Sequence, residues 1–290
     1  MSDGTSDSIP LITSLPPSLS RRDAAGDEVG AAYQERCIES WRRAGFEPIS
    51  VNSTAESHHH AVRTIPVSRD ASVITGRPQV FLADVLAVAS EQANGRPFVV
   101  MNADLLIRPD MALAANVLGL HAGEFLFSRR IDIRRPDQTH GMPFLHGYDF
   151  FAGHADDISG LRDGGFVFGA PWWDYYLPLM MFARGCRIYQ TEPPVLHLTH
   201  AVNWLDAWEK LGARFIDETR AHVANDKFRS RLEEAMNRRG GHLLSLRYSA
   251  WKLIPKNAAI ERKRMLHRVA GASMSFLNDV AAPRTVMSQP

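Results

Sequence analysis

The sequence contains little cysteine and no long apolar run. Its two cysteines, Cys37 and Cys186, provide no disulfide framework and fit a reducing compartment. No run of about 18 apolar residues is present, so we expect no membrane-spanning helix. Residues 1–8 are polar and acidic, unlike the basic and apolar start of a secretory signal peptide. These absences predict a cytoplasmic protein.

Two glycine-rich signatures of phosphate binding are also absent. Neither the Gly-x-Gly-x-x-Gly turn of dinucleotide sites nor the Gly-x-x-x-x-Gly-Lys-Ser/Thr loop of P-loop enzymes occurs in the sequence. If the protein binds a phosphorylated ligand, the phosphates must therefore be held by a metal ion and by side chains.

The net charge of +1 conceals an uneven distribution. Segment 227–268 has twelve Lys and Arg residues against three Glu, a local charge of +9, so the remainder carries −8. This basic segment suits a peripheral membrane contact, an acidic partner or the acidic body of the same chain, or it is a solvated helical face. It lacks the interleaved aromatic residues of single-strand binders, so we expect no nucleic-acid partner.

The first 107 residues alternate between apolar strands and amphipathic helices. With 290 residues, 45% of them apolar, the chain is long enough for one large domain. The alternation is typical of a doubly wound α/β fold with a mostly parallel sheet and helices on both faces. We expect strands over 10–15, 46–51 and 62–67, helices over 27–44, 55–61 and 80–93, and a further strand in the apolar stretch 96–109.

The stretch 96–109 is the centre of the predicted fold. Its Val-rich apolar run is interrupted by Asn102 and Asp104. Burying an unpaired carboxylate is costly, so we expect Asp104 at the carboxyl end of the strand, facing the crevice in which open α/β sheets bind ligands. A carboxylate there, close to an amide, suits a divalent cation that bridges to a diphosphate.

The second half of the chain departs from the regular alternation. The sequence divides into a disordered N-terminus (1–9), an α/β region (10–200), a helical basic appendage (201–278) and a disordered tail (279–290). After residue 109 we expect a helix over 110–120, strands over 124–132 and 144–151, and a helix that begins after Pro171 and ends at Gly185. Strands over 187–190 and 193–200 and helices from Trp204 onward follow.

Met101-Asn102-Ala103-Asp104 resembles the Asp-x-Asp motif of glycosyltransferases with the GT-A fold, and it ends the fourth strand, where that family has it. The resemblance covers residues 10–200. It implies a GT-A-like, Rossmann-related fold in which Asp104 binds Mn²⁺ or Mg²⁺ and the cation bridges the phosphates of a nucleotide-diphospho-sugar. Asn102 would contact the ribose or the metal. It replaces an acid of the family motif, so the site has one charge fewer.

The resemblance implies further ligand-binding residues. Thr13 and Ser14 end the first strand where the family holds the nucleobase, and Asn52 ends the second strand where it reads the base or ribose. His197 and His200 lie in the late segment from which many metal-dependent members take another metal ligand. Side chains three residues apart point to opposite faces of an extended strand, so one metal-bound histidine is favoured unless the chain turns between the two. An imidazole ligand favours Mn²⁺ over Mg²⁺.

Two acidic residues lie beside aromatic ones. Asp149 follows Tyr148, and Asp174 follows Trp172-Trp173. An aromatic plane next to a carboxylate suits a sugar, which has apolar ring faces and hydroxyl rims, although the two tryptophans suit a core equally well. The resemblance implies that a carboxylate near the start of a helix deprotonates the acceptor hydroxyl. Asp174 matches that position best, and Asp149 then binds the sugar or is the competing base.

These residues predict a metal-assisted glycosyltransferase of hexosyltransferase type, which moves a sugar from a nucleotide-diphospho-sugar to an acceptor hydroxyl in glycan or polysaccharide biosynthesis. Two alternatives stay open. A sugar-phosphate nucleotidyltransferase shares the sheet, but we expect it to have a glycine-rich basic loop directly after the first strand, where this chain has no glycine before Gly26. A non-catalytic carbohydrate- or partner-binding module on the same fold would agree with Asn102 in place of an acid.

Overall fold

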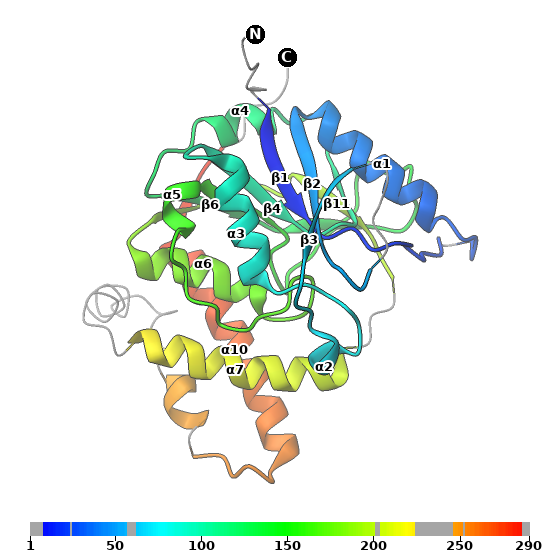
Figure 1. The fold of residues 1–290 in the computed structure, drawn as a ribbon. Helices are drawn as coiled ribbons and strands as arrows, with labels where there is room; N and C mark the ends of the chain where they lie inside the picture. The colour runs from blue at the N-terminus through cyan, green and yellow to red at the C-terminus, as the bar shows by residue number, and fades with distance from the viewer. Residues whose placement is uncertain are drawn as a thin grey trace.

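A computed structural model shows a large sheet with helices on both faces (Figure 1). It describes residues 8–285 except 24, 57–61, 201–203, 224–245 and 252. In chain order the elements are β1 (Ile9–Thr13), α1 (Gly30–Arg43), β2 (Phe46–Ser53), β3 (Arg63–Val67), α2 (Ser72–Thr75), α3 (Leu82–Ala93), β4 (Pro97–Met101), β5 (Leu105–Ile107), α4 (Leu113–Leu118), β6 (Glu124–Ser128), β7 (Arg130–Ile133), β8 (Met142–Pro143), β9 (Phe150–His154), α5 (Ala155–Ile158), α6 (Trp173–Arg184), β10 (Arg187–Gln190), β11 (Val195–Leu198), α7 (Leu205–Val223), α10 (Ala259–Val280) and β12 (Ala282–Pro283).

The main sheet is mostly parallel, as the alternation of strands and helices predicted. Its strand order is β12–β10–β6–β9–β4–β1–β2–β3. Every neighbouring pair is parallel except those of β9, which is antiparallel to both β4 and β6. The α/β fold class is therefore confirmed, and the carboxyl ends of β1, β2 and β4 meet at one edge of the sheet.

A smaller sheet has the order β5–β11–β7–β8. Three of its strands, β5, β7 and β11, directly follow β4, β6 and β10 of the main sheet along the chain. Short polar connections mark each change of sheet: residues 102–104, Arg129 and residues 191–194. The predictions of single strands over 96–109 and 124–132 are therefore wrong, because the chain turns at these polar residues and pairs with another sheet.

Alternate side chains of the main sheet enter two separate cores. One core lies under α3, α6, α7 and α10, and the other lies under α1, α4 and the smaller sheet. Because both faces are buried, the central strands read as continuous apolar runs. The first core receives Phe98, Val100, Phe125, Phe127 and Phe151, and the second receives Val99, Met101, Leu126, Phe150 and Ala152.

The C-terminal helices belong to this fold. α10 packs against α6 and α7, and its Val269 and Phe276 are fully buried. β12 extends the main sheet by pairing in parallel with β10, and Arg284 Nη1 lies 3.6 Å from the Glu124 carboxylate. The prediction of a disordered tail from 279 is therefore wrong for residues 279–285, which finish α10 and form the edge strand.

Other sequence predictions differ in detail or lie outside the described residues. Ile9, predicted to be disordered, begins β1, and the strand predicted over 144–151 starts only at Phe150. Most of the helix predicted over 55–61 and half of the basic segment lie outside the described residues. Within the described ranges, no helix is both long and apolar enough to cross a membrane.

Three residues of α1 fasten the smaller sheet to the main body. Trp41 Nε1 donates to the Leu105 carbonyl at 2.6 Å, and the Ser40 hydroxyl accepts from the N–H of β5 residue Ile107 at 3.0 Å. The buried Tyr33 hydroxyl accepts from the N–H of β11 residue Leu198 at 3.0 Å and donates to a carbonyl of the same strand. α1 thus holds β5 and β11, the two strands that flank the candidate site described below.

We expect Tyr33→Phe to lower the free energy of unfolding by about 1–3 kcal/mol, because it leaves the buried N–H of Leu198 in β11 without its acceptor. Urea unfolding followed by circular dichroism measures the loss. Tyr189→Phe is the control, since the Tyr189 hydroxyl contacts Glu124 nearer the surface. Equal losses in the two variants would contradict a special role for Tyr33.

Candidate active site

Asp104 lies in the turn between β4 and β5, and the pairing of the smaller sheet brings His197 beside it. His197 of β11 is paired with Leu105 of β5 on one side and with Asp132 of β7 on the other. Its Nε2 atom lies 3.4 Å from Oδ2 of Asp104, and its Nδ1 atom lies 3.1 Å from Oδ1 of Asp132. The imidazole is therefore held between two carboxylates.

His200, two residues beyond the end of β11, faces the same carboxylate. Thr199 before it is fixed on β7, because its backbone N–H and its hydroxyl both donate to the Ile133 carbonyl, at 2.9 and 2.7 Å. Nε2 of His200 lies 3.5 Å from Oδ2 of Asp104. The ligand atoms of Asp104, His197 and His200 all lie within 4.8 Å of one another, so both histidines face one point, where the sequence favoured a single one. This group could hold a metal ion.

The charges of the group favour ionised forms. Burial lowers the pKa of His197, but the Asp104 and Asp132 carboxylates outweigh burial and raise that pKa above its usual value. Burial raises the pKa of Asp104, but His197, His200 and Arg21 outweigh it and hold that pKa well below its usual value. Asp104 is thus an anion, and the proton on the facing imidazole is one that a divalent cation would displace.

Asp132 and Arg130 set the orientation of His197. The Asp132 carboxylate faces Nδ1 and favours a proton there, which directs Nε2 toward Asp104. Arg130 Nε in turn donates to Asp132 at 2.8 Å. Metal-binding histidines typically have their second ring nitrogen fixed by a carboxylate in this way.

Arg21 was not among the residues predicted for the site, and it makes a close contact with Asp104. Its Nη2 donates at 2.6 Å to Oδ2, the oxygen that both histidines face, and its Nε is buried without a hydrogen-bond partner. Glu28 fixes this loop against α1 by accepting from the N–H groups of Arg21 and Gly30, at 2.8 and 3.0 Å. The sequence offers only a pair of basic residues after the first strand, which indicates no partner 83 residues away.

Arg130, which donates to Asp132, also contacts Asp149, and Asp149 is hydrogen-bonded to Asn102. Asn102 Nδ2 and Arg130 Nη1 both donate to Oδ1 of Asp149, at 3.1 and 3.0 Å, and the guanidinium lies 3.9 Å from the centre of the Phe144 ring. The other oxygens, Oδ1 of Asn102 and Oδ2 of Asp149, are buried and have no hydrogen-bond partner. Buried acceptors are normally satisfied, so this pair suits the hydroxyl groups of a ligand.

Asp174 lies in the first turn of α6, and its carboxylate approaches the backbone of Gly147 and Tyr148. The Tyr148 N–H donates to Oδ2 of Asp174 at 3.3 Å, and a Cβ atom at Gly147 would lie only 2.5 Å from the same oxygen. Burial, reinforced by the charge of Asp149, raises the pKa of Asp174 to about 7. A carboxylate with this pKa can exchange a proton near neutral pH.

The aromatic residues predicted to form a sugar platform lie in the core instead. Trp172, Trp173 and Tyr148 are each no more than 2% exposed. Trp172 has a left-handed backbone (φ 82°), rare for a large residue, and its indole N–H donates to the Trp208 carbonyl at 2.8 Å. The Tyr148 hydroxyl donates to Asn278 at 3.0 Å. The prediction that these rings form a sugar-binding platform is therefore wrong, because other parts of the protein cover them.

The residues predicted to contact the nucleobase lie at the carboxyl ends of β1 and β2. Asn52 is fully buried, and its Nδ2 donates to the Leu15 carbonyl at 2.7 Å, which fixes the loop after β1. Thr13 is also buried, and its Oγ1 has no hydrogen-bond partner, whereas Ser14 is half-buried. Asn52 therefore has a structural role within the chain, and contact of these residues with a base stays a prediction.

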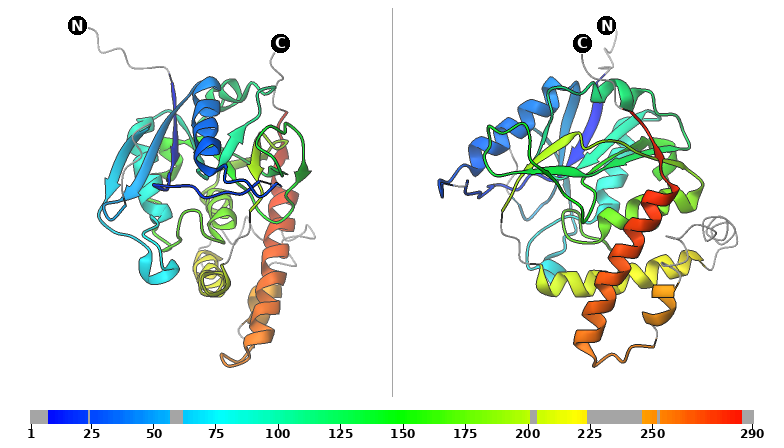
Figure 2. Two further views of the ribbon diagram at one scale, coloured as in Figure 1. Left: turned by 90° about the vertical axis from the view of Figure 1, so that its right-hand side faces the viewer. Right: turned by 180° about the vertical axis from the view of Figure 1, so that it is seen from behind.

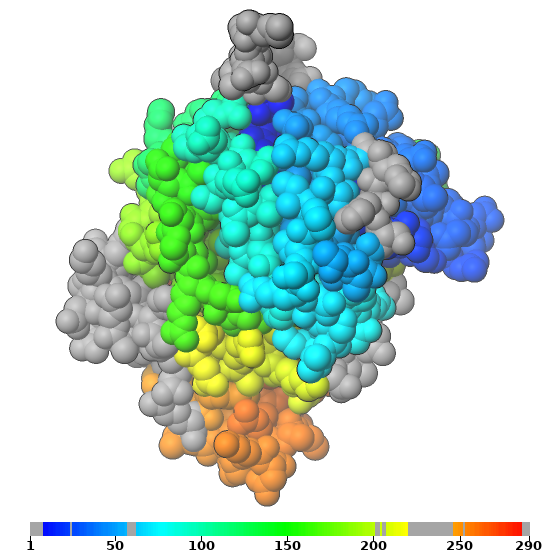
Figure 3. Space-filling model, viewed as in Figure 1, coloured from blue at the N-terminus to red at the C-terminus, as the bar shows by residue number. Residues whose placement is uncertain are grey.

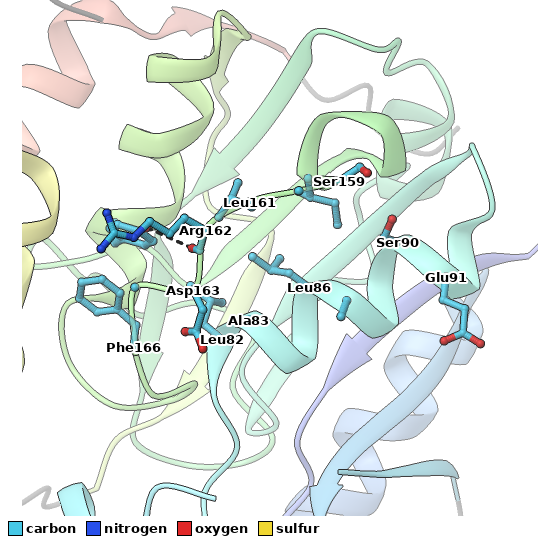
Figure 4. Close-up of a pocket in the computed structure, with 15 residues that line it drawn as sticks. Leu82, Ala83, Leu86, Ser90, Glu91, Ser159, Leu161, Arg162, Asp163 and Phe166 are labelled. Carbon is cyan, nitrogen blue, oxygen red and sulfur yellow. Dashed lines mark hydrogen bonds between the residues drawn. The ribbon is translucent and has the colours of Figure 1, made fainter. Parts of the chain in front are cut away.

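A cavity of about 340 Å³ lies between α3 and the segment 158–164 (Figure 4). Leu86 and Leu161 contribute apolar surface to it, and Arg162 and Asp163 contribute charge. None of the residues predicted for the site lines this cavity, and Asp104, His197 and His200 lie outside it. The cavity is therefore not the candidate active site.

No known protein family and no curated protein matches the sequence. Among solved structures, the chain is similar to the mannosyltransferase PcManGT from Pyrobaculum calidifontis in complex with GDP-Man and Mn²⁺, with 15% identity, coverage of 92% of this chain and 86% of that one, and a TM-score of 0.43. It is also similar to HddC from Yersinia pseudotuberculosis (11% identity, 64% and 91% coverage, TM-score 0.37) and to a putative glucose-1-phosphate thymidylyltransferase from Bacillus anthracis (10%, 64% and 87%, 0.39). With these TM-scores below 0.5, the likenesses assign the chain to no family and no activity.

We expect Arg21→Gln to strengthen Mn²⁺ binding by the nucleotide-free protein about tenfold, because the guanidinium and the cation compete for Oδ2 of Asp104. Isothermal titration calorimetry measures the affinity. Arg22→Gln is the matched control, since Arg22 lies in the same loop but donates to the Gly26 carbonyl. Weaker Mn²⁺ binding by Arg21→Gln would contradict this competition.

We expect Asp174→Asn to stabilise the protein by on the order of 2 kcal/mol at about pH 8 and to have little effect below about pH 4. The pKa of Asp174 is about 7 in the folded protein against an ordinary value of 3.8, so the wild type loses stability as the pH rises through this range. Urea unfolding of both proteins at the two pH values measures the difference. The same gain at both pH values would be inconsistent with the raised pKa.

Proposed function

We propose that the protein is a glycosyltransferase that moves a sugar from a nucleotide-diphospho-sugar to an acceptor hydroxyl. The observation that supports this most is the convergence of Asp104, His197 and His200 within 4.8 Å, at the edge where β4 leaves the main sheet. A diphosphate bound at this edge needs a positive partner, because the chain has no glycine-rich phosphate loop.

The three residues fit a divalent cation. Two imidazole nitrogens and one carboxylate oxygen suit Mn²⁺ better than Mg²⁺, which prefers oxygen ligands alone. Asp132 holds His197 with Nε2 directed into the group. A cation bound there would supply Lewis-acid stabilisation to the departing nucleoside diphosphate.

Arg21 and Asn102 bind the donor in this proposal. With a cation bound at Asp104, the Arg21 guanidinium would need another anionic partner, and the phosphates of the donor would provide one. The unpartnered Oδ1 of Asn102 would accept a hydrogen bond from a ribose or sugar hydroxyl. In this proposal Asn102 contributes hydrogen bonds and no charge. This role suits an amide at the position where the Asp-x-Asp motif has an acid.

Asp174 is the proposed base. It accepts the proton of the acceptor hydroxyl while that oxygen bonds to the anomeric carbon and the bond from this carbon to the diphosphate breaks. Its pKa of about 7 suits a base that works near neutral pH. Asp149, already bonded to Arg130 and Asn102, would orient the acceptor or sugar through its unpartnered Oδ2.

We expect one nucleoside diphosphate among UDP, GDP, CDP and dTDP to stabilise the protein only when Mn²⁺ or Mg²⁺ is present. At a hundredfold excess over its dissociation constant, a ligand that binds only the folded state adds about 2.7 kcal/mol, which a thermal-shift measurement detects. The shift should disappear with chelator and in Asp104→Asn.

Asp110→Asn is the matched control for this experiment, because Asp110 is also paired with an arginine but its side chain is 60% exposed. A shift that survives in Asp104→Asn would overturn the role of Asp104. No shift with any of the four nucleotides would favour the non-catalytic binding module over the glycosyltransferase.

A further inference from the structure

The C-terminal part of the chain ends in a projection that the sugar-transfer site does not use. We call residues 246–264 except 252 the C-terminal tip: it consists of the helical segment 246–251, a turn, and the start of α10. Figures 1 and 2 show this tip, in orange, beyond α7. It lies on the same side of the molecule as the carboxyl ends of β1 and β2.

The C-terminal tip has a defined conformation. Tyr248 and Trp251 are no more than 7% exposed, and the Arg262 guanidinium lies 3.9 Å from the centre of a Trp251 ring. The Leu253 N–H donates to the Ala250 carbonyl at 3.1 Å. The hydrogen-bonded turn and the buried rings of Tyr248 and Trp251 therefore fix the positions of the side chains in the tip that face solvent.

Three large apolar side chains of the C-terminal tip face solvent. Leu253 is 83% exposed, Ile260 is 64% exposed and Leu246 is 50% exposed. Across the described residues only four other large apolar side chains are comparably exposed: Val73, Leu118, and the neighbouring Met142 and Leu145. Such a concentration of exposed apolar surface indicates an interaction site.

Positive charge surrounds these apolar residues. Lys256, Lys263 and Arg264 are exposed, and Glu261 is the one acid among the described residues of the tip. Lys263 and Arg264 lie in the first turns of α10, where a positive charge gains nothing from the helix dipole. Helix electrostatics therefore does not explain the cluster, whereas an external anionic surface does.

We propose that the C-terminal tip docks on the surface of an anionic phospholipid membrane. Leu253 and Ile260 enter the boundary between headgroups and acyl chains, and the Lys and Arg residues contact lipid phosphates. A projecting tip suits a membrane better than an acidic protein, because a stable protein interface buries about 800 Å² on each partner and needs a broader surface. In the space-filling view the tip forms the narrow lower end of the molecule (Figure 3).

This docking would turn the edge of the main sheet that carries the candidate site toward the membrane (Figure 1). The docking itself does not depend on the proposed sugar transfer, because vesicle binding is measured without nucleotide, metal or acceptor. Failure of one proposal therefore leaves the other intact.

The test is cosedimentation of the full-length protein with phosphatidylcholine vesicles that contain or lack phosphatidylglycerol. We expect binding to the anionic vesicles, weaker binding to the neutral ones, and a loss of binding as salt is raised. Leu253→Glu/Ile260→Glu should lower the affinity for anionic vesicles by about tenfold or more, and so should Lys263→Glu/Arg264→Glu.

Val73→Glu/Leu118→Glu is the matched control, because it makes the same change at exposed positions of α2 and α4 and should bind like the wild type. Circular dichroism checks that each variant is folded. Absence of wild-type binding to anionic vesicles would overturn the proposal. Wild-type affinity in either tip variant, or an equal loss in the control, would overturn it as well.

Discussion

A carboxylate that is mostly buried and yet ionised is the constraint on which the candidate site depends. The Asp104 side chain is only 15% exposed, and a charge in such a place is unstable unless other groups compensate it. Arg21 and the two histidines do so directly. Asp132 then lies between His197 and Arg130, and Arg130 contacts Asp149. Charges of opposite sign thus alternate through the site, and the loss of one member removes a compensating charge from its neighbours.

Asp104 and Asp174 show how their surroundings shift the pKa values of two identical groups in opposite directions. The positive groups around Asp104 outweigh the effect of its burial and hold its pKa well below the usual value, which favours the anion. Asp174 has a buried position with another carboxylate, Asp149, near it, and its pKa is raised to about 7. The first environment suits the binding of a cation, and the second suits the transfer of a proton.

The sequence predicted the parts of this arrangement that follow from local pattern. Asp104 could be found because it interrupts an apolar run, and the mostly parallel sheet followed from the alternation of strands and helices. Arg21 could not be found, since its partner depends on the path of a loop. The passage of the chain from β4 in the main sheet to β5 in the smaller one was missed because both strands are apolar. The burial of Trp172 depends on α7, which supplies the acceptor of its indole N–H.

The pairing of β12 with β10 has a consequence for the synthesis of the protein. β12 is the last strand of the described chain, and it covers an edge of the main sheet whose partner was made some ninety residues earlier. Until residues 282–283 have left the ribosome, this edge of β10 lacks its strand partner and presents unpaired backbone groups. The main sheet therefore cannot be completed until the last described strand of the chain has been synthesised.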